Sequence, residues 1–336
     1  MINFANLSAY HFVSELDIIE ITAANDVTFT ITDSNSDVVL SSTYTPVDGV
    51  VHVYHLSKLL QPLITEVVAD FTFTAGSTSK TVHVVQSRER VQEPAMTFLP
   101  SFFLSEVMTE RDTAIGRREC VSLLPLSTTT VTAVCTYWDG SALSTATKTV
   151  ATNLAAGTVH TLDVSPSAMV DSSMGDLVAY EVVAGERTMR YRVTILPNAS
   201  VAMLAQNNFG CYEPIYLQGM TEFNTDFTRE SALINGQLKH YNIEAVKTYK
   251  SFTGALRPAG VLLAQDLAAS KDVYLLENNI TGDAIVITAV DVIYTDEDSE
   301  VPDFSFTWRH ASMMGASTTA VRPPELFDDT FDDTYN

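Results

Sequence analysis

The dipeptide Asn235-Gly236 restricts the fold of this chain more than any other feature of its sequence. Both residue types tolerate the positive φ angles of a two-residue hairpin turn. Apolar side chains then recur at every second position over 241–245, which is the period of a β-strand. The pattern predicts a β-hairpin inside the stretch from Asn207 to Leu256.

An aromatic cluster opens the same stretch. Phe209, Tyr212 and Tyr216 lie close together in sequence, with Gly210 and Pro214 between them as turn-forming residues. Aromatic side chains dominate protein interfaces and protein cores alike. We therefore name these three aromatic residues as candidate interface residues, with ordinary core packing as the alternative.

Strand patterns of the same period occur along the whole chain. Val27, Phe29 and Ile31 alternate with threonines, and a long apolar run from Ile285 to Tyr294 predicts a central strand. Apolar residues make up 46% of the sequence and charged residues 18%. This balance suits β-sheets and argues against a disordered chain, so we expect a mainly β protein.

A length of 336 residues exceeds one ordinary core, so we expect several domains. Polar segments that contain proline mark the boundaries, at Ser87–Pro94 and at Pro197-Asn198. We predict two immunoglobulin-like β-sandwich domains over 1–90 and 91–197, a third β-rich domain over 198–316, and an extended acidic C-terminal arm, here called the acidic tail, over 317–336.

One short helix is expected in the third domain, over 259–269. Pro258 precedes it, as is common at the first position of a helix. Leu263 and Leu267 are four residues apart and would share one face.

The formal net charge of −22 is spread along the chain without a basic patch. Binding to nucleic acid or to an anionic membrane is therefore disfavoured. Residues 1–12 lack the basic and apolar regions of a signal peptide, and no apolar run is long enough for a transmembrane helix. We expect no Sec export, and we expect the three cysteines to be reduced thiols in a cytoplasm.

No catalytic motif is recognisable. The seven histidines are scattered, and the sequence has no GxSxG, P-loop or HExxH motif. Asp and Glu are plentiful, but no spacing singles out the carboxylate pair of a glycoside hydrolase. We predict a protein that is not an enzyme and has no catalytic, cofactor-binding or metal-binding residue.

One acidic segment, 296–303, is dense in the oxygen ligands that Ca²⁺ prefers. It lacks the spacing and the turn glycine of a known calcium loop. A solvated hairpin tip is the alternative that we favour.

The acidic tail contains a near repeat, FDDTFDDT, with Phe327, Phe331 and Tyr335 four residues apart. One interpretation is a docking arm whose aromatic side chains insert into a neighbouring subunit. The other is a disordered acidic tail. On the first interpretation these three residues join the candidate interface.

Five stretches carry a resemblance to a known class of proteins: Thr43–Leu60, Phe98–Glu106, Thr136–Ser141, Asn207–Gly219 and Leu262–Leu276. They resemble stretches of structural virion proteins, of the tail or baseplate type, from phages and prophages of gut Bacteroidetes. Turns and aromatic anchors, rather than catalytic signatures, carry this resemblance. It implies a multidomain β protein that assembles symmetrically into a particle, and it carries over no catalytic residue.

The first functional hypothesis is a non-enzymatic structural component of a phage particle (tail, baseplate or neck), made in the host cytoplasm and located in the virion. Copies of itself and other virion structural proteins would be its partners, through contacts of the β domains and the tail. Capsid decoration is an alternative role. A further alternative is an adhesin that binds host surface glycan or a receptor, which an exposed Trp138 would favour. A glycan-degrading virion enzyme ranks last.

Overall fold

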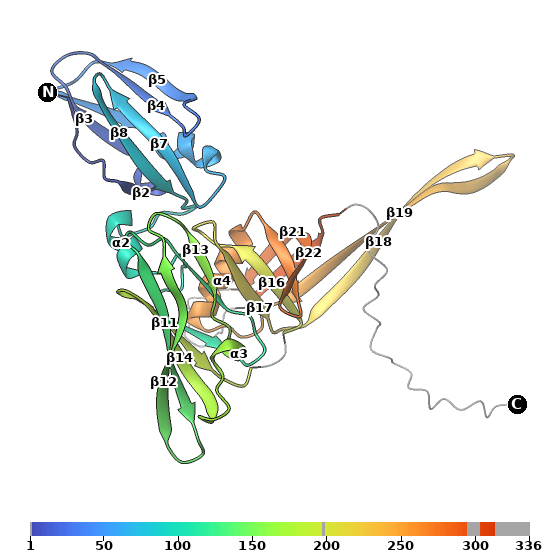
Figure 1. Ribbon diagram of the computed structural model, residues 1–336. Coiled ribbons are helices and arrows are strands. Elements are labelled where there is room, and N and C mark those ends of the chain that lie inside the picture. Colours follow the sequence, from blue (N-terminus) through green and yellow to red (C-terminus); the bar gives the residue numbers. More distant parts are fainter. Residues whose placement is uncertain (1, 197–198, 294–302, 313–336) are drawn as a thin grey trace, which may run out of the picture.

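The computed structural model describes residues 2–196, 199–293 and 303–312. The fold is mainly β, as predicted, and its helices are short. Within the described ranges the strands form five sheets. Figure 1 shows these sheets as three domains, with the first (blue) at one end of the second (green) and the third (orange) beside the second. A long hairpin leads away from all three.

The first domain packs two sheets against each other. One has the strand order β1-β3-β6 and the other the order β2-β8-β7-β4-β5. Alternate residues of both sheets, such as Ile21 and Phe29, are buried between them. An immunoglobulin-like topology stays a prediction. The elements are β1 (Asn3–Phe4), β2 (Tyr10–Phe12), β3 (Ile18–Thr22), β4 (Val27–Thr32), β5 (Val38–Tyr44), β6 (Val50–Tyr54), α1 (Leu56–Leu60), β7 (Val68–Ala75) and β8 (Thr78–Val85).

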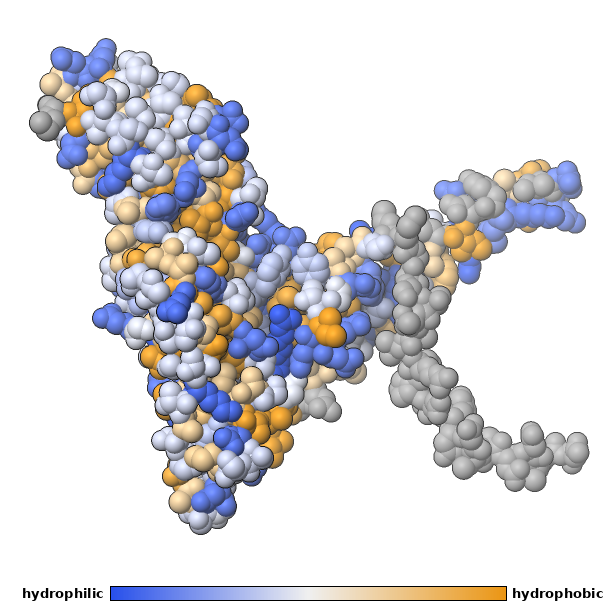
Figure 2. All heavy atoms as spheres, in the orientation of Figure 1, coloured by the Kyte–Doolittle hydropathy of each residue, from blue (hydrophilic) through white to orange (hydrophobic). Residues whose placement is uncertain are grey.

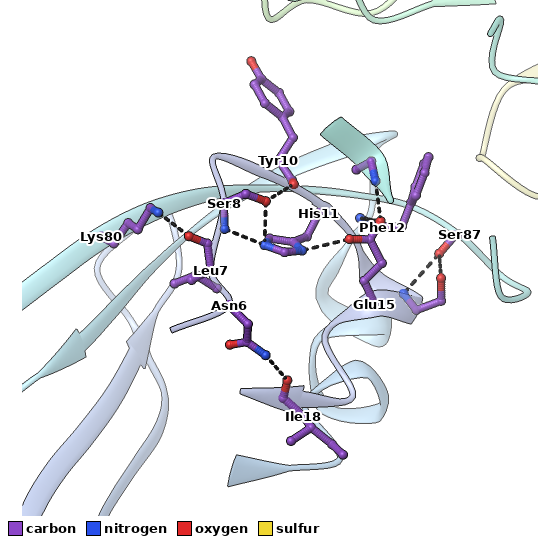
Figure 3. A network of polar contacts seen from close by, with 12 residues as sticks. Asn6, Leu7, Ser8, Tyr10, His11, Phe12, Glu15, Ile18, Lys80 and Ser87 are labelled. Atoms are coloured by element: carbon purple, nitrogen blue, oxygen red, sulfur yellow. Dashed lines mark hydrogen bonds and ion pairs between the residues drawn. The ribbon is translucent and has the colours of Figure 1, made fainter. Parts of the chain in front are cut away.

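A polar network ties the first domain to the second (Figure 3). Nδ1 of His11 lies 2.9 Å from Oε2 of Glu15, and Nε2 accepts a hydrogen bond of 2.8 Å from the backbone N–H of Ser8. The other oxygen of Glu15 accepts hydrogen bonds from the backbone N–H of Phe12, at 3.2 Å, and of Ala95, at 2.6 Å. Because Ala95 begins α2 (Ala95–Ser101), Glu15 joins the first domain to the helix that starts the second.

The second domain has a larger sheet of order β12-β11-β14-β15-β9 and a two-stranded sheet, β10-β13. Three tyrosines fill its core, and the rings of Tyr180 and Tyr191 stack with their centroids 4.8 Å apart. The hydroxyl of Tyr180 donates to the carbonyl of Val164 at 2.7 Å. The elements after α2 are β9 (Glu110–Thr113), β10 (Cys120–Leu123), β11 (Thr129–Trp138), β12 (Leu143–Leu154), β13 (His160–Asp163), α3 (Pro166–Met169), β14 (Asp176–Ala184) and β15 (Arg187–Val193).

The third domain is one sheet of order β17-β16-β20-β21-β22-β19-β18 with α4 (Pro258–Ala269) packed against it. The helix confirms the one expected in this domain, and β21 confirms the expected central strand because β20 and β22 pair with its two sides. Leu267 of α4 and Trp308 of β22 belong to its core. The strands are β16 (Val201–Gln206), β17 (Tyr212–Leu217), β18 (Thr221–Ile234), β19 (Gln237–Phe252), β20 (Val273–Glu277), β21 (Ile280–Ile293) and β22 (Asp303–His310).

Candidate functional site

The turn from Asn207 to Cys211 leads into β17 and contains the first candidate residue, Phe209. The side-chain oxygen of Asn207 accepts hydrogen bonds from the backbone N–H of Phe209 and of Cys211, both at 3.0 Å. Gly210 has a φ of 79°, and an added Cβ would collide with the side chain of Gln86. Local hydrogen bonds and a glycine therefore set this turn.

Phe209 is fully buried by its own chain. Its ring centroid lies 5.6 Å from that of Phe12, in the first domain, and 5.2 Å from that of Phe98, in α2. The three rings belong to one apolar cluster, to which all three domains contribute, and which we call the junction core. This buried, apolar environment agrees with the alternative that Phe209 is an ordinary core residue.

The two candidate tyrosines are half-buried. The hydroxyl of Tyr216 accepts a hydrogen bond of 2.6 Å from the backbone N–H of Arg118 and donates one of 3.1 Å to its carbonyl. The guanidinium of Arg117 lies 4.5 Å from the centre of the Tyr216 ring. The ring of Tyr212 meets that of Tyr274 edge-on, with centroids 5.9 Å apart.

The remaining candidates lie outside the described residues. They are Phe327, Phe331 and Tyr335 of the acidic tail, and most of the acidic segment 296–303. An interface role for all six aromatic residues therefore stays a prediction.

Buried charges also hold the second and third domains together. Nη2 of Arg111 lies 2.6 Å from Oε1 of Glu213, and each side chain is only 4% exposed. Glu119 is buried near the same guanidinium, so two carboxylates face one cation. Burial raises the pKa of Glu119 to about 7, although Arg111 opposes the shift.

A second buried ion pair joins the segment after β8 to the third domain. Nη2 of Arg88 lies 2.6 Å from Oδ1 of Asp266 in α4. Burial raises the pKa of Asp266 to about 7 in spite of this pair. The neighbouring Asn208 donates a hydrogen bond of 2.5 Å to Glu106 and accepts one of 2.7 Å from the backbone N–H of Glu89. Both polar contacts reinforce the junction of the domains.

These groups do not form a catalytic arrangement. The carboxylates of Glu119 and Glu213 line neither the cleft where the three domains meet nor the cleft between β9 and α4. All three cysteines are free and buried, and burial raises the pKa of each thiol, that of Cys211 to about 12. A protonated thiol is a poor nucleophile. Among the residues that the structure describes, no group of three or more His, Cys, Asp or Glu could hold a metal ion.

The larger cleft, of about 1120 Å³, lies where the three domains meet, and we call it the junction cleft. Its apolar part comes from Val67 and Val68 of the first domain, Val159 of the second and Tyr212 of the third. Its charged lining comprises four carboxylates and a single guanidinium: Asp33, Glu66, Asp70, Asp272 and Arg118. The cleft is therefore lined by apolar side chains and by a net negative charge, and we call its five charged residues the rim.

A smaller cleft, of about 290 Å³, lies between β9 and α4. Ion pairs occupy its wall, where Asp112 lies 2.6 Å from Arg192 and 3.0 Å from Arg257. This cleft is part of the contact between the second and third domains rather than an open site.

The hairpin of β18 and β19, here called the projecting hairpin (221–252), extends beyond its own sheet (Figure 1). Its turn is the predicted Asn235-Gly236, and the φ angles of 54° and 75° suit a type I′ turn, which confirms the hairpin. Strand β19 pairs with β22 only over Tyr249–Phe252. Farther out, β18 and β19 pair only with each other among the described strands, over roughly 35 Å.

One face of the projecting hairpin is apolar and cationic. Lys247 and Arg229 lie on it, at 4.8 Å from the ring centre of Phe223 and 5.7 Å from that of Phe227. Apolar residues of this face are 55% to 74% exposed: Phe223, Phe227, Leu233, Leu238 and Ile243. Figure 2 shows apolar side chains (orange) along the hairpin.

The opposite face holds the carboxylates of β18. Glu222, Asp226 and Glu230 alternate with the residues of the apolar face. Along the register pairs from Phe223 to Leu233, the apolar face has no carboxylate. The projecting hairpin is therefore two-faced in both polarity and charge.

The sequence pattern predicted the turn and the strand after it but not the two different faces of the hairpin. Their signal is visible in the sequence, because the two phenylalanines, Arg229 and Leu233 of 223–233 occupy odd positions, whereas Asp226 and Glu230 occupy even ones. The lack of a covering strand could not be found this way. Pairing partners are set by the tertiary structure.

No helix of the described residues is long and apolar enough to cross a membrane. No family model matches the sequence, and no curated protein matches it. Among solved structures, a chain from the virion of a native gene transfer agent particle shares 9% identity and a TM-score of 0.23. The match covers 33% of this chain and 91% of that chain. A chain from the tail of the empty particle, with C6 symmetry, gives 9% identity, a TM-score of 0.24, and coverage of 33% and 90%. TM-scores of this size do not establish a shared fold.

Proposed function

We propose that this protein is a non-enzymatic structural component of a phage-type particle, in the tail, baseplate or neck, that assembles with copies of itself and with other virion proteins. The projecting hairpin is the observation that carries the proposal. An isolated two-stranded hairpin is at best marginally stable in water, and this one exposes a face of large apolar side chains. Such a face is expected to be covered in an assembly.

The charge of the hairpin supports association with a second copy. Residues 221–252 contain four basic and four acidic side chains, whereas the whole chain has a net charge of −22. Most of the surface of one copy therefore repels another copy, but the hairpin does not. Its two cations on the apolar face would be attracted to an acidic neighbour.

The other roles have less support. The described residues contain no catalytic arrangement that would favour an enzyme. Trp138 is 41% exposed at the end of β11, but it lines neither cleft. A glycan-binding adhesin and a capsid decoration protein stay predictions from the sequence.

Sedimentation velocity of the purified full-length chain, over a range of concentrations, tests the proposal. The wild-type chain is expected to self-associate into a closed oligomer or a filament. The double substitution Phe223→Ser and Phe227→Ser should weaken assembly by at least about tenfold, since aromatic anchors dominate interface energetics.

Asn224→Ser with Thr228→Ser is the matched control, because it changes the opposite face of the same strand. The control should assemble like the wild type. A wild-type chain that stays monomeric at every concentration, or a Phe223→Ser/Phe227→Ser variant that assembles normally, would contradict the proposal.

A further inference from the structure

The projecting hairpin and the junction cleft have complementary surfaces. The hairpin presents exposed aromatic rings and two cations without a carboxylate. The cleft is lined by apolar side chains and by a rim of four carboxylates and one guanidinium. Each surface therefore matches the other in polarity and is opposite to it in charge.

One chain does not bring these two surfaces together. The hairpin leads away from the three domains, whereas the cleft lies where they meet (Figure 1). Contact between them therefore requires two copies.

We propose that the projecting hairpin of one copy seats its apolar face in the junction cleft of a second copy. This inference rests on the proposed function and names the contact that would perform it. The rings of Phe223 and Phe227 would pack against the valines and Tyr212 of the cleft. Arg229 and Lys247 would exchange their contacts with those rings for ion pairs with rim carboxylates such as Glu66 and Asp272.

The size of the cleft fits a chain segment. At about 1120 Å³ it exceeds the roughly 300–1,000 Å³ of typical small-molecule pockets. It is open to solvent at its charged rim, where Glu66 and Asp272 are exposed. The same cleft contains Tyr212, which gives one of the candidate interface residues a specific contact.

The contact determines the kind of symmetry. Because the hairpin and the cleft are different surfaces, each copy donates one hairpin and receives another. Contacts of this kind generate a closed ring when the rotation closes, and a filament when it does not. A dimer that exchanges two hairpins is the smallest closed ring of this kind.

Charge reversal in the cleft tests the inference. Glu66→Lys with Asp272→Lys changes two exposed rim carboxylates and should weaken assembly of the full-length chain at least about tenfold, because like charges would then face each other. Adding Arg229→Glu and Lys247→Glu to the same chain restores opposite charges and should return assembly to the wild-type level. Sedimentation velocity gives the affinity, and electron microscopy distinguishes closed rings from filaments.

Asp176→Lys with Glu186→Lys is the control, since it makes the same change in net charge at exposed sites outside the cleft. Circular dichroism and the thermal midpoint should show that every variant is folded. If the cleft variant and the control assemble equally, or if the fourfold variant does not recover, the inference is overturned. Should the Phe223→Ser/Phe227→Ser variant nevertheless fail to assemble, the proposed function stands and the hairpin docks elsewhere. A wild-type chain without assembly would overturn both.

Discussion

At the scale of single residues, Asn207 shows how one side chain can hold a junction of domains. Its oxygen accepts two backbone hydrogen bonds of the turn, and its nitrogen donates one of 2.8 Å to the carbonyl of Leu104 in the second domain. The same amide therefore sets the conformation of the turn and attaches the turn to the second domain. Phe209 points into the junction core as a consequence.

Glu119 is the residue whose protonation should affect stability most clearly. Glu213 already pairs with Arg111 at 2.6 Å, so the guanidinium compensates Glu119 only in part, with a smaller contribution from Arg117. Burial raises the pKa of Glu119 from 4.5 to about 7 in the folded protein. The folded state therefore binds more protons than the unfolded state between these two values, and stability falls as pH rises through this window.

We expect the substitution Glu119→Gln to remove this part of the pH dependence. The wild type should lose about 3 kcal/mol, relative to the variant, between pH 4.5 and pH 7, with little further change above or below. Urea unfolding of both proteins at pH 5 and pH 8 measures the difference. Equal pH dependence in the two proteins would show that Glu119 is ionised in the folded state at both pH values.

At the scale of elements, the projecting hairpin extends the core face of its sheet into solvent. Tyr249 of β19 pairs with Trp308 of β22, and the two rings stack with their centroids 4.2 Å apart. Phe223 is the register partner of Tyr249 and lies on the same face, but it is 69% exposed. The apolar face therefore continues along the hairpin beyond the residues of β19 that pair with β22.

The Asn235-Gly236 turn should affect the local stability of the outer half of the hairpin and not the stability of the rest of the protein. Gly236 has a φ of 75° and open space where a Cβ would lie, so Gly236→Ala introduces backbone strain of about 1 kcal/mol without a clash. Amide hydrogen exchange near the turn should accelerate about fivefold, with an unchanged thermal midpoint of the protein.

Gly236→Asn is the matched variant, because asparagine tolerates this conformation better than alanine, and it should exchange more slowly than Gly236→Ala. Equal exchange rates in the wild type and in Gly236→Ala would mean that the turn does not limit the opening of the hairpin.

Across the full chain, the junction core and the buried ion pairs join the three domains to one another. Phe12, Phe98 and Phe209 come from three different domains and contact one another. Separate cores fill each domain in addition. Cooperative unfolding of the three domains is therefore expected to depend on the junction core.

The substitution Phe209→Ala should lower the free energy of unfolding by about 3–5 kcal/mol and separate the unfolding of the first domain from that of the others. Scanning calorimetry would show the separation as additional transitions. Phe29→Ala removes an equally buried ring from the core of the first domain alone and serves as the control. A Phe209→Ala protein that still unfolds in the same number of transitions as the wild type would show that the junction core does not couple the domains.

The local structure of this protein follows directly from its amino-acid sequence. Period-two alternation predicted the β-strands, the Asn235-Gly236 dipeptide predicted the hairpin turn, and the leucine spacing after Pro258 predicted α4. These features depend on residues that are neighbours in the chain. Backbone preferences and side-chain periodicity are sufficient to find them.

The sequence pattern does not show which residues are buried together or which strands remain without a partner. Arg111 and Glu213 are 102 residues apart in sequence, and the carboxylates of the junction cleft come from more than one domain. The exposed face of β18 looks like an ordinary strand pattern in the sequence, because alternation shows that a strand has two faces but not what covers them. Burial and pairing depend on contacts between distant segments, and the folded chain alone settles those contacts.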